Sequence, residues 1–298
     1  KKLELPYLNN KLHAKLSFDT LQTELKNAKY SGNDYKISGS WSVKNMLINQ
    51  PRIASNDIIV QSAKLDADIL VGPNYIALDS SSTAYLKNAE IHPFIKYTLG
   101  KNKIYELKLK APEQDAQAVL NAFPQGLFES LEGLKVQGKV KYSLNFYLDT
   151  KIPDSVRFNS TLTPVDFKIT KWGKTDLQKI NNTFVYTPYE YGKPMRDITI
   201  GPSNHNFTPL NQISKNFINA VLTAEDPSFF THNGFVEESI RKSIAVNYKE
   251  KKFKRGGSTI SMQLVKNVYL SRQKTLARKA EEILIVWLIE HNHLVSKN

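Results

Sequence analysis

The stretch LKVQGKVKYSLNFYL, residues 134–148, decides the fold of the first two thirds of the chain. Its even-numbered positions are almost all apolar, whereas most of its odd-numbered positions carry lysine, glutamine, serine or asparagine. A period of two sustained over this length is typical of a long β-strand or hairpin with one apolar and one hydrated face. Two further runs share the pattern, at residues 64–71 and, after the turn-forming Pro153-Asp154, at residues 156–162.

Residues 1–195 are therefore expected to form a β-rich domain of long antiparallel strands, with a short helix at residues 112–123. Such strands could build a sandwich, or a curved, half-open sheet that shelters lipid chains. The second arrangement resembles the AsmA-type envelope modules. His13 and His92 stand alone among scattered carboxylates, so this region offers no catalytic constellation and its function is left open.

The amino-acid composition changes at residues 192–211, where glycine, proline and asparagine cluster as in a linker. Beyond it the apolar positions recur at helical spacing, at Ile213, Phe217, Ala220, Val221 and Ala224. This helix should end near Asp226, because Pro227 disfavours helical geometry in the residue before it. The pattern predicts a second, mostly helical domain at residues 196–298 and an α+β fold class for the chain.

Composition limits the possible partners. The 298 residues carry a formal charge of +13, which favours phosphorylated ligands, an acidic membrane surface or nucleic acid. No recognised reader motif accompanies the lysines, so nucleic acid is not expected as a partner. There are no cysteines, which excludes disulfides and thiolate metal sites, and no apolar run is long enough to span a membrane.

A first candidate site lies at residues 224–234, where Glu225 and Asp226 end an apolar helix and His232 follows. Partial desolvation beside the aromatic residues Phe229 and Phe230 can suit such a carboxylate to proton transfer. The alternative is a helix terminus with two exposed acids and a histidine that caps it.

A second candidate site lies at residues 255–267, where Gly256 and Gly257 precede a helix. The glycines allow close approach of a ligand to the backbone, and Ser258 or Thr259 can serve as the N-cap. The free N–H groups and the dipole of such a helix start favour an anion, and basic residues flank it, so a phosphate-bearing ligand is expected. The alternative is a glycine-rich loop with an ordinary cap.

A third candidate site is a helix that carries Arg278, Lys279 and Glu282 on one face, at spacings of three and four residues. The alternative is an ion pair in solvent, which would stabilise the helix by about 0.3 kcal/mol. The apolar positions expected to form the buried side of this helix are Leu276, Ala280, Ile283, Leu284, Trp287 and Leu288.

Taken in order, the three sites resemble the first three sequence blocks of the peptidoglycan glycosyltransferases, the family of bifunctional penicillin-binding proteins and monofunctional transglycosylases. The family patterns are Glu-Asp-x-x-Phe-x-x-His-x-Gly, Gly-x-Ser-Thr-Ile-x-x-Gln and Arg-Lys-x-x-Glu. The matching residues are Glu225, Asp226, Phe229, His232 and Gly234, then Gly256 or Gly257, Ser258, Thr259, Ile260 and Gln263, then Arg278, Lys279 and Glu282.

The resemblance implies a lysozyme-like catalytic domain that polymerises lipid II into β-1,4-linked glycan and releases undecaprenyl diphosphate. Glu225 matches the general base, and Glu282 matches a second essential carboxylate that could hold a divalent cation, Mg²⁺ or Mn²⁺. The residues implied in binding the sugar or the diphosphate are Asp226, His232, Gly257, Ser258, Thr259, Gln263, Lys266, Arg278 and Lys279. No organic cofactor is implied.

The resemblance also implies a location and partners. The family works at the periplasmic, outer face of the bacterial cytoplasmic membrane, so we expect lipid II, undecaprenyl-diphosphate-linked glycan, the membrane surface and the cell-wall synthesis machinery as partners. A transmembrane anchor would lie upstream of Lys1.

Two departures qualify the resemblance. Family members carry glutamine where this chain has Met262, and they have further blocks after the third, which would follow Lys297. We therefore expect the catalytic fold of residues 196–298 to be truncated and inactive by itself. Two rival functions are kept open: a lysozyme-like glycan hydrolase using Glu225 and Glu282, and a non-catalytic envelope module that binds lipid.

Overall fold

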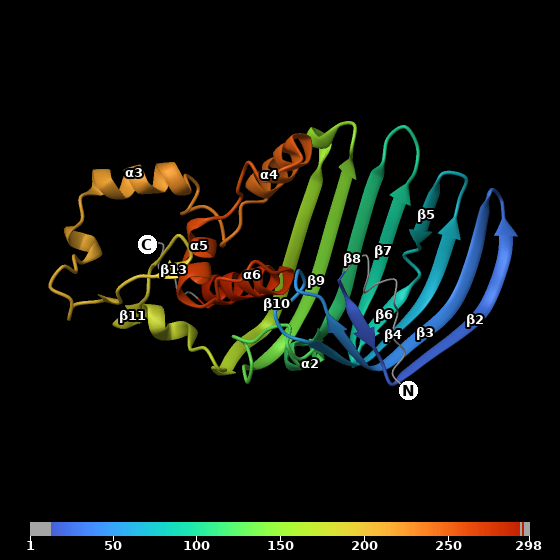
Figure 1. The fold of residues 1–298 in the computed structure, drawn as a ribbon, viewed down its shortest axis with the longest axis horizontal. Coiled ribbons are helices and arrows are strands. Elements are labelled where there is room, and N and C mark those ends of the chain that lie inside the picture. The colour runs from blue at the N-terminus through green and yellow to red at the C-terminus, as the bar shows by residue number, and fades with distance from the viewer. Residues whose placement is uncertain (1–12, 293, 295–298) are drawn as a thin grey trace. The chain divides into compact units, whose positions relative to one another are not determined.

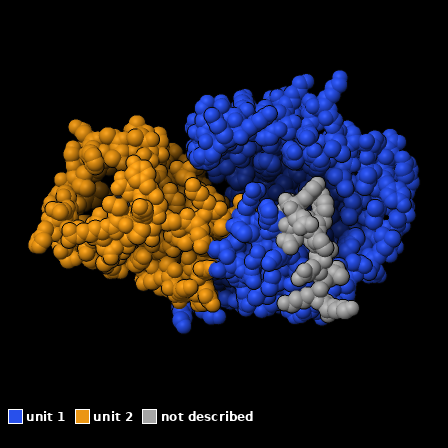
Figure 2. Space-filling view, in the orientation of Figure 1, with its two compact units in different colours: residues 1–128, 135–171, 237–256 blue, residues 129–134, 172–236, 257–298 orange. Residues whose placement is uncertain are grey.

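The computed structural model describes residues 13–292 and 294, and its large β-rich region followed by helices is compatible with the α+β class (Figure 1). The described chain divides into two compact units, which interleave along the sequence (Figure 2). Unit 1 comprises residues 1–128, 135–171 and 237–256, and unit 2 comprises residues 129–134, 172–236 and 257–298. The domain boundary expected at residues 195 and 196 stays a prediction.

Unit 1 is built on one antiparallel sheet of long, curved strands (Figure 1). In the described chain its strands are β1 (Lys15–Ser17), β2 (Thr20–Ser31), β3 (Asp34–Asn49), β4 (Ile58–Val71), β5 (Tyr75–Leu78), β6 (Thr83–Leu86), β7 (Ala89–Thr98), β8 (Ile104–Asp115), β9 (Lys135–Asp149) and β10 (Arg157–Lys171). Along the sheet the order is β1-β3-β4-β5-β7-β8-β9-β10; in addition, β2 pairs with β3, and β6 pairs with β4 and β7.

The three strand predictions are confirmed. The quoted stretch forms β9, in which Val136, Val140 and Leu148 are buried while the lysines between them are exposed. The runs at residues 64–71 and 156–162 lie in β4 and β10. The helix expected at residues 112–123 is shorter, since α2 spans Ala116–Ala122 and residues 112–115 continue β8. The carboxylate of Asp115 sets the start of α2 by accepting a hydrogen bond from the amide of Ala118.

Helix α4 (Glu237–Glu250) belongs to unit 1 although it lies between the first two candidate sites in sequence. Its Ala245 packs against Leu148 of β9 and against Val156, which follows the 3-10 helix η1 (Pro153–Ser155). The carboxylate of Glu237 accepts hydrogen bonds from the side chain of Asn159 and the amide of Ser160 in β10.

Unit 2 holds α3 (Lys215–Glu225), α5 (Ile260–Val268) and α6 (Leu276–His291). Before them lie the 3-10 helices η2 (Leu177–Asn181) and η3 (Leu210–Gln212) and the short strands β11 (Phe184–Tyr186), β12 (Tyr189–Glu190), β13 (Lys193–Pro194) and β14 (Ile198–Ile200). The core is formed by α5 and α6, whose Val265, Ile285, Val286 and Ile289 are fully buried. None of the helices in the described ranges is long and apolar enough to cross a membrane.

The buried side predicted for α6 is wrong in part. Leu276, Ala280 and Ile283 are exposed, and the buried residues are Ala277, Glu281, Glu282, Ile285, Val286, Leu288 and Ile289. The helix is apolar around most of its circumference, so periodicity alone cannot select the inner face. The two glutamates are accommodated in the buried face because each carboxylate has hydrogen-bond donors.

Candidate active site

Helix α3 ends where the sequence predicts, and this end presents Glu225. Asp226 is the C-cap residue with an extended φ of −157°, and its amide donates to the carbonyl of Leu222. Because the backbone turns at Asp226, the two neighbouring carboxylates have different surroundings. Glu225 is exposed, whereas Asp226 is buried with 4% of its surface exposed.

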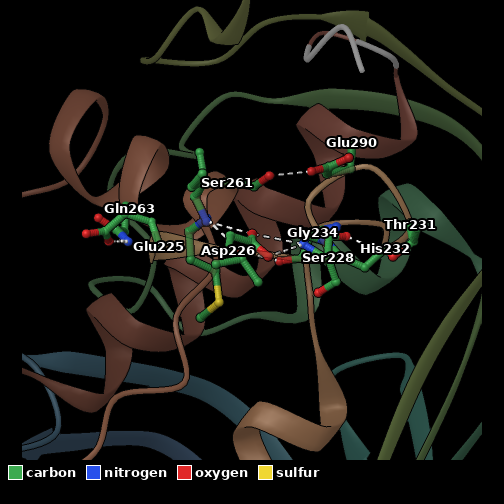
Figure 3. Close-up of polar contacts among 12 residues, drawn as sticks. Glu225, Asp226, Ser228, Thr231, His232, Gly234, Ser261, Gln263 and Glu290 are labelled. Carbon is green, nitrogen blue, oxygen red and sulfur yellow. Dashed lines mark hydrogen bonds and ion pairs between the residues drawn. The ribbon is translucent and has the colours of Figure 1, made fainter. Parts of the chain in front are cut away.

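The turn that follows α3 folds His232 back onto Asp226 (Figure 3). The Nε2 atom of His232 lies 2.9 Å from one oxygen of Asp226 and 3.1 Å from the other. The Nδ1 atom accepts a hydrogen bond from the amide of Gly234, so the proton of a neutral ring must be on Nε2, pointing at the carboxylate. The pair is therefore a buried, oriented contact.

The same carboxylate also holds the start of α5. It accepts a hydrogen bond of 3.1 Å from the amide of Ile260, the first residue of that helix. Thr259 is the N-cap: its hydroxyl accepts from the amide of Met262 and donates to the carbonyl of Gly234. Asp226 thereby joins the first two sequence blocks, and its charge suits the positive end of the α5 dipole.

This network brings the exposed carboxylate of Glu225 to α5. The side-chain amide of Gln263 donates a hydrogen bond of 2.8 Å to Glu225 (Figure 3). The first residue of the first block is thus held by the last residue of the second. Met262, where the family carries glutamine, is 4% exposed and packs in the interior, so this departure leaves the Gln263 contact in place.

Two residues that the sequence did not single out complete this region. The hydroxyl of Ser261 donates a short hydrogen bond to Glu290 near the end of α6 (Figure 3). A Cβ on Gly234, whose φ is +85°, would lie 2.5 Å from a methyl of Val286 and 3.0 Å from the side chain of Glu290. The one sequence signal for Glu290 is that a carboxylate directly follows the apolar run of α6.

The third block forms a separate cluster on α6. Glu282 is 1% exposed, and its two oxygens accept from Nη1 of Arg278 at 2.8 Å and from Nζ of Lys279 at 2.5 Å. The predicted pairing is confirmed, but the carboxylate is buried and not solvated. Among the described residues, no hydrogen bond or ion pair joins this cluster to Glu225 or Gln263.

The arrangement around Glu282 does not fit a metal ligand. Both carboxylate oxygens are already bound by cationic side chains, and the described residues hold no group of three histidine, aspartate or glutamate side chains suited to a metal ion. A role for Mg²⁺ or Mn²⁺ stays a prediction, and no step below depends on it.

The remaining predicted binding residues lie close to α5. Gly257 and Ser258 precede the N-cap, where Ser258 is exposed. Lys266 lies in the last turn of α5, at the opposite end from the helix N-terminus. Contacts of Gly257, Ser258 and Lys266 with a diphosphate stay predictions.

A further buried carboxylate lies next to the third block. Glu281 is 5% exposed and accepts a hydrogen bond of 2.6 Å from the amide of Ser130. Burial raises the pKa of this carboxyl above its ordinary value. Glu281 anchors the segment 129–134 to α6 within unit 2.

Comparison with known proteins agrees with the three blocks. Residues 191–298 match the model of the transglycosylase family. The chain is 40% identical over 86 residues to a biosynthetic peptidoglycan transglycosylase of Paraburkholderia xenovorans, a match that covers 29% of this chain and 36% of that protein. A protein of the same name from Burkholderia cenocepacia is 37% identical over 95 residues, which cover 32% of this chain and 39% of the relative.

The chain thus spans little more than a third of the length of these curated relatives, 36% and 39%. No solved structure matches it. The matched range, residues 191–298, includes the residues that form the Asp226 network, the Glu225–Gln263 contact and the Glu282 cluster. Residues 191–298 of this chain are therefore similar to the transglycosylase family and to biosynthetic peptidoglycan transglycosylases.

Proposed function

We propose that residues 191–298 supply the catalytic base and part of the diphosphate site of a peptidoglycan glycosyltransferase. The reaction would polymerise lipid II into β-1,4-linked glycan strands with release of undecaprenyl diphosphate. The observation that carries the proposal is the Gln263–Glu225 hydrogen bond, because it fixes an exposed carboxylate at the point where the first two family blocks meet.

In this proposal Glu225 takes the proton from the 4-hydroxyl of the acceptor sugar. The resulting oxygen forms a bond to the anomeric carbon of the donor while the bond from that carbon to the diphosphate oxygen breaks, with inversion. Gln263 restricts the rotamers of Glu225 so that one oxygen stays free to accept the proton. The other carboxylate oxygen of Glu225 accepts the hydrogen bond from the side-chain amide of Gln263.

Asp226 and His232 act by positioning in this scheme. Both are nearly enclosed, with 3% and 8% of their side-chain surfaces exposed, so they hold the start of α5 against the end of α3. We infer that they reach the substrate only through the backbone and side chains that they fix. The sequence predicts that Asp226 and His232 bind the substrate directly, whereas in this proposal their effect on the substrate is indirect.

The leaving diphosphate needs fixed positive charge. Lys279 is 40% exposed and Arg278 16% exposed, and the buried Glu282 holds both cations in one orientation. Guanidinium and ammonium groups of this kind suit phosphate oxygens. The N-terminus of α5, with Ser258 exposed beside it, supplies a second candidate anion contact.

The environment of Glu282 argues against the rival hydrolase. A glycosidase needs a second carboxylate free to activate water or attack the sugar. Glu282 is 1% exposed and each of its oxygens is paired with a cation, so it is poorly placed to activate water or attack a sugar.

The test uses the intact protein with lipid II as substrate. We expect polymer and undecaprenyl diphosphate from the wild type, and loss of both on Glu225→Gln with lipid II binding retained. Polymerisation by the Glu225→Gln protein would refute the assignment of the base. Soluble muropeptides and new reducing ends from finished murein would establish the hydrolase instead.

Location and partners follow from the proposed reaction. Its lipid-linked substrate places the enzyme at the periplasmic face of the cytoplasmic membrane, where the cell-wall synthesis machinery acts. A lysozyme-like arrangement of the complete catalytic domain is part of the same proposal.

A further inference from the structure

The two faces of the unit 1 sheet differ in charge. Directly opposed residues form an unbroken apolar row across six strands: Ile37, Ile69, Leu78, Ile95, Leu107 and Phe146. We call the face that carries this row the apolar face. The neighbouring row on the other face includes Lys36, Lys96, Glu106 and Arg157.

The apolar face carries no charged residue over most of its length. Its positions at residues 35–43, 65–71, 91–97, 105–111 and 142–148 are occupied by tyrosine, tryptophan, phenylalanine, aliphatic residues, glycine and proline. Side chains in a strand alternate between faces, so the lysines and acids of the same strands point the other way. The charge segregation therefore follows from the sequence period.

Large side chains of this face are in contact with solvent. The exposed fractions are 48% for Ile76, 47% for Ile95, 40% for Val71 and 39% for Tyr105. Among the described elements of unit 1, α4 packs on the sheet near Leu148, and α2 packs against β7, β8 and β9. An uncovered sheet face of this kind marks a binding surface, because a solvated sheet face is normally polar.

The chemistry of the apolar face specifies a hydrocarbon chain. The backbone groups of the central strands are paired within the sheet, so an extended peptide cannot add to them as a further strand. Six residue steps, such as Tyr105 to Ala111, span about 20 Å. An acyl chain in one leaflet of a bilayer spans roughly 15 Å, so it fits along a strand, whereas an undecaprenyl chain is several times longer.

A cationic rim lies at one end of this face. Lys101, Lys103 and Lys151 lie in two adjacent turns, which are joined by mutual hydrogen bonds of 3.0 Å between Lys103 and Thr150. All three lysines are exposed, and none of them takes part in an ion pair in the part of the chain that the structure describes.

The apolar face meets this rim at two stacked tyrosines. The rings of Tyr97 and Tyr105 lie 5.0 Å apart, next to the turn that carries Lys101 and Lys103. Tyrosine suits a boundary between hydrocarbon and water, and lysines near an anionic lipid surface are attracted to it.

We propose that the apolar face binds the acyl chains of an anionic glycerophospholipid, with the phosphate at Lys101, Lys103 and Lys151. The inference stands independently of the glycosyltransferase assignment, since it uses residues of unit 1 alone.

The first test uses the full chain and vesicles of phosphatidylglycerol and phosphatidylcholine with a trace of acyl-labelled fluorescent phosphatidylglycerol. Gel filtration then measures the fluorescence that leaves with the protein. Ile76→Glu/Ile95→Glu alters exposed side chains of the apolar face, and we expect at least a tenfold loss of bound lipid. The matched control, Thr161→Glu/Thr163→Glu, adds the same charge to exposed positions of the opposite face of β10 and should bind within twofold of wild type.

The second test addresses the headgroup. Lys101→Glu/Lys103→Glu/Lys151→Glu should remove the preference for phosphatidylglycerol over phosphatidylcholine. Lys135→Glu/Lys168→Glu/Lys171→Glu makes the same charge change at the other end of β9 and β10 and should keep that preference.

Three results would overturn the proposal. Equal lipid binding by the Ile76→Glu/Ile95→Glu protein would exclude the apolar face. A lipid-free wild-type dimer that dissociates on this substitution would identify a second copy as the occupant. If undecaprenyl phosphate displaced the labelled lipid at a lower concentration than phosphatidylglycerol does, the ligand of the apolar face would be a polyprenyl chain and not acyl chains.

Discussion

The side-chain amide of Gln263 donates a 2.8 Å hydrogen bond to Glu225, so the first turn of α5 holds the last residue of α3. We expect Gln263→Ala to lower kcat for lipid II polymerisation by about tenfold to a hundredfold, since a hydrogen bond to a charged group contributes roughly 1.5–3 kcal/mol. Steady-state release of undecaprenyl diphosphate by the intact protein measures this. Gln273→Ala removes an exposed glutamine of the same unit and should leave kcat unchanged. An equal loss in both variants would contradict a specific role of Gln263.

The buried Asp226 predicts a large stability effect. Asp226→Ala would leave the donors of His232 and Ile260 without an acceptor, at a cost of about 3 kcal/mol or more in the free energy of unfolding. Asp226→Asn keeps one acceptor oxygen and should lose clearly less. Urea unfolding of the two variants checks the order. A smaller loss for alanine than for asparagine would show that the carboxylate does not hold the start of α5.

Gly234 offers a test in which a matched glycine separates two causes of destabilisation. Gly234→Ala adds a methyl 2.5 Å from Val286 and also strains a φ of +85°, so we expect a loss of about 2–4 kcal/mol. Gly192→Ala has a similar φ of +79° but open space around it, so it reports the backbone strain alone. Thermal unfolding should show a clearly larger loss at Gly234. Equal losses would mean that α6 can move away at no cost.

Glu281 predicts a pH dependence of stability. Burial raises the pKa of its carboxyl in the folded protein. At a pH between 4.5 and this raised pKa, the native state therefore keeps a proton that the unfolded chain has released. The resulting contribution to the free energy of unfolding is full below the ordinary pKa of 4.5 and is lost as pH rises through the raised value. Glu281→Gln should therefore flatten the stability curve above pH 4.5.

Urea unfolding of wild type and Glu281→Gln across a pH series measures this difference. Glu190→Gln, an exposed carboxylate in unit 2, should follow the wild-type curve. A wild-type protein that gained stability relative to Glu281→Gln with rising pH would have the opposite sign to the one expected.

The sequence predicts local features of this protein well where one physical rule acts alone. Alternation in residues 134–148 indicated β9, and Pro227 marked the end of α3. Thr259 was one of two expected N-caps, and the spacing of Arg278 and Glu282 indicated their pairing. In each case the determinant is contained within a few neighbouring residues.

Features that depend on tertiary packing could not be predicted from the local sequence. The inner face of α6 could not be selected because Leu276 and Ile283 are as apolar as the residues that are buried. The Ser261–Glu290 hydrogen bond joins residues that are 29 positions apart, and neither has a distinctive local pattern. The burial of Glu281 depends on a backbone amide at Ser130, which no periodicity in α6 indicates.

The interleaving of the two units limits how this protein can be divided. The polypeptide leaves unit 2 after residue 236, forms α4 on the sheet of unit 1, and returns at residue 257. A single cut cannot separate the units, and a truncation that keeps the transglycosylase-like segment but removes the strands would leave Ala245 of α4 without its packing partners. The β-rich part therefore supplies the packing partners of one helix of the family segment, and a gene fusion or domain exchange that keeps these contacts has to carry both.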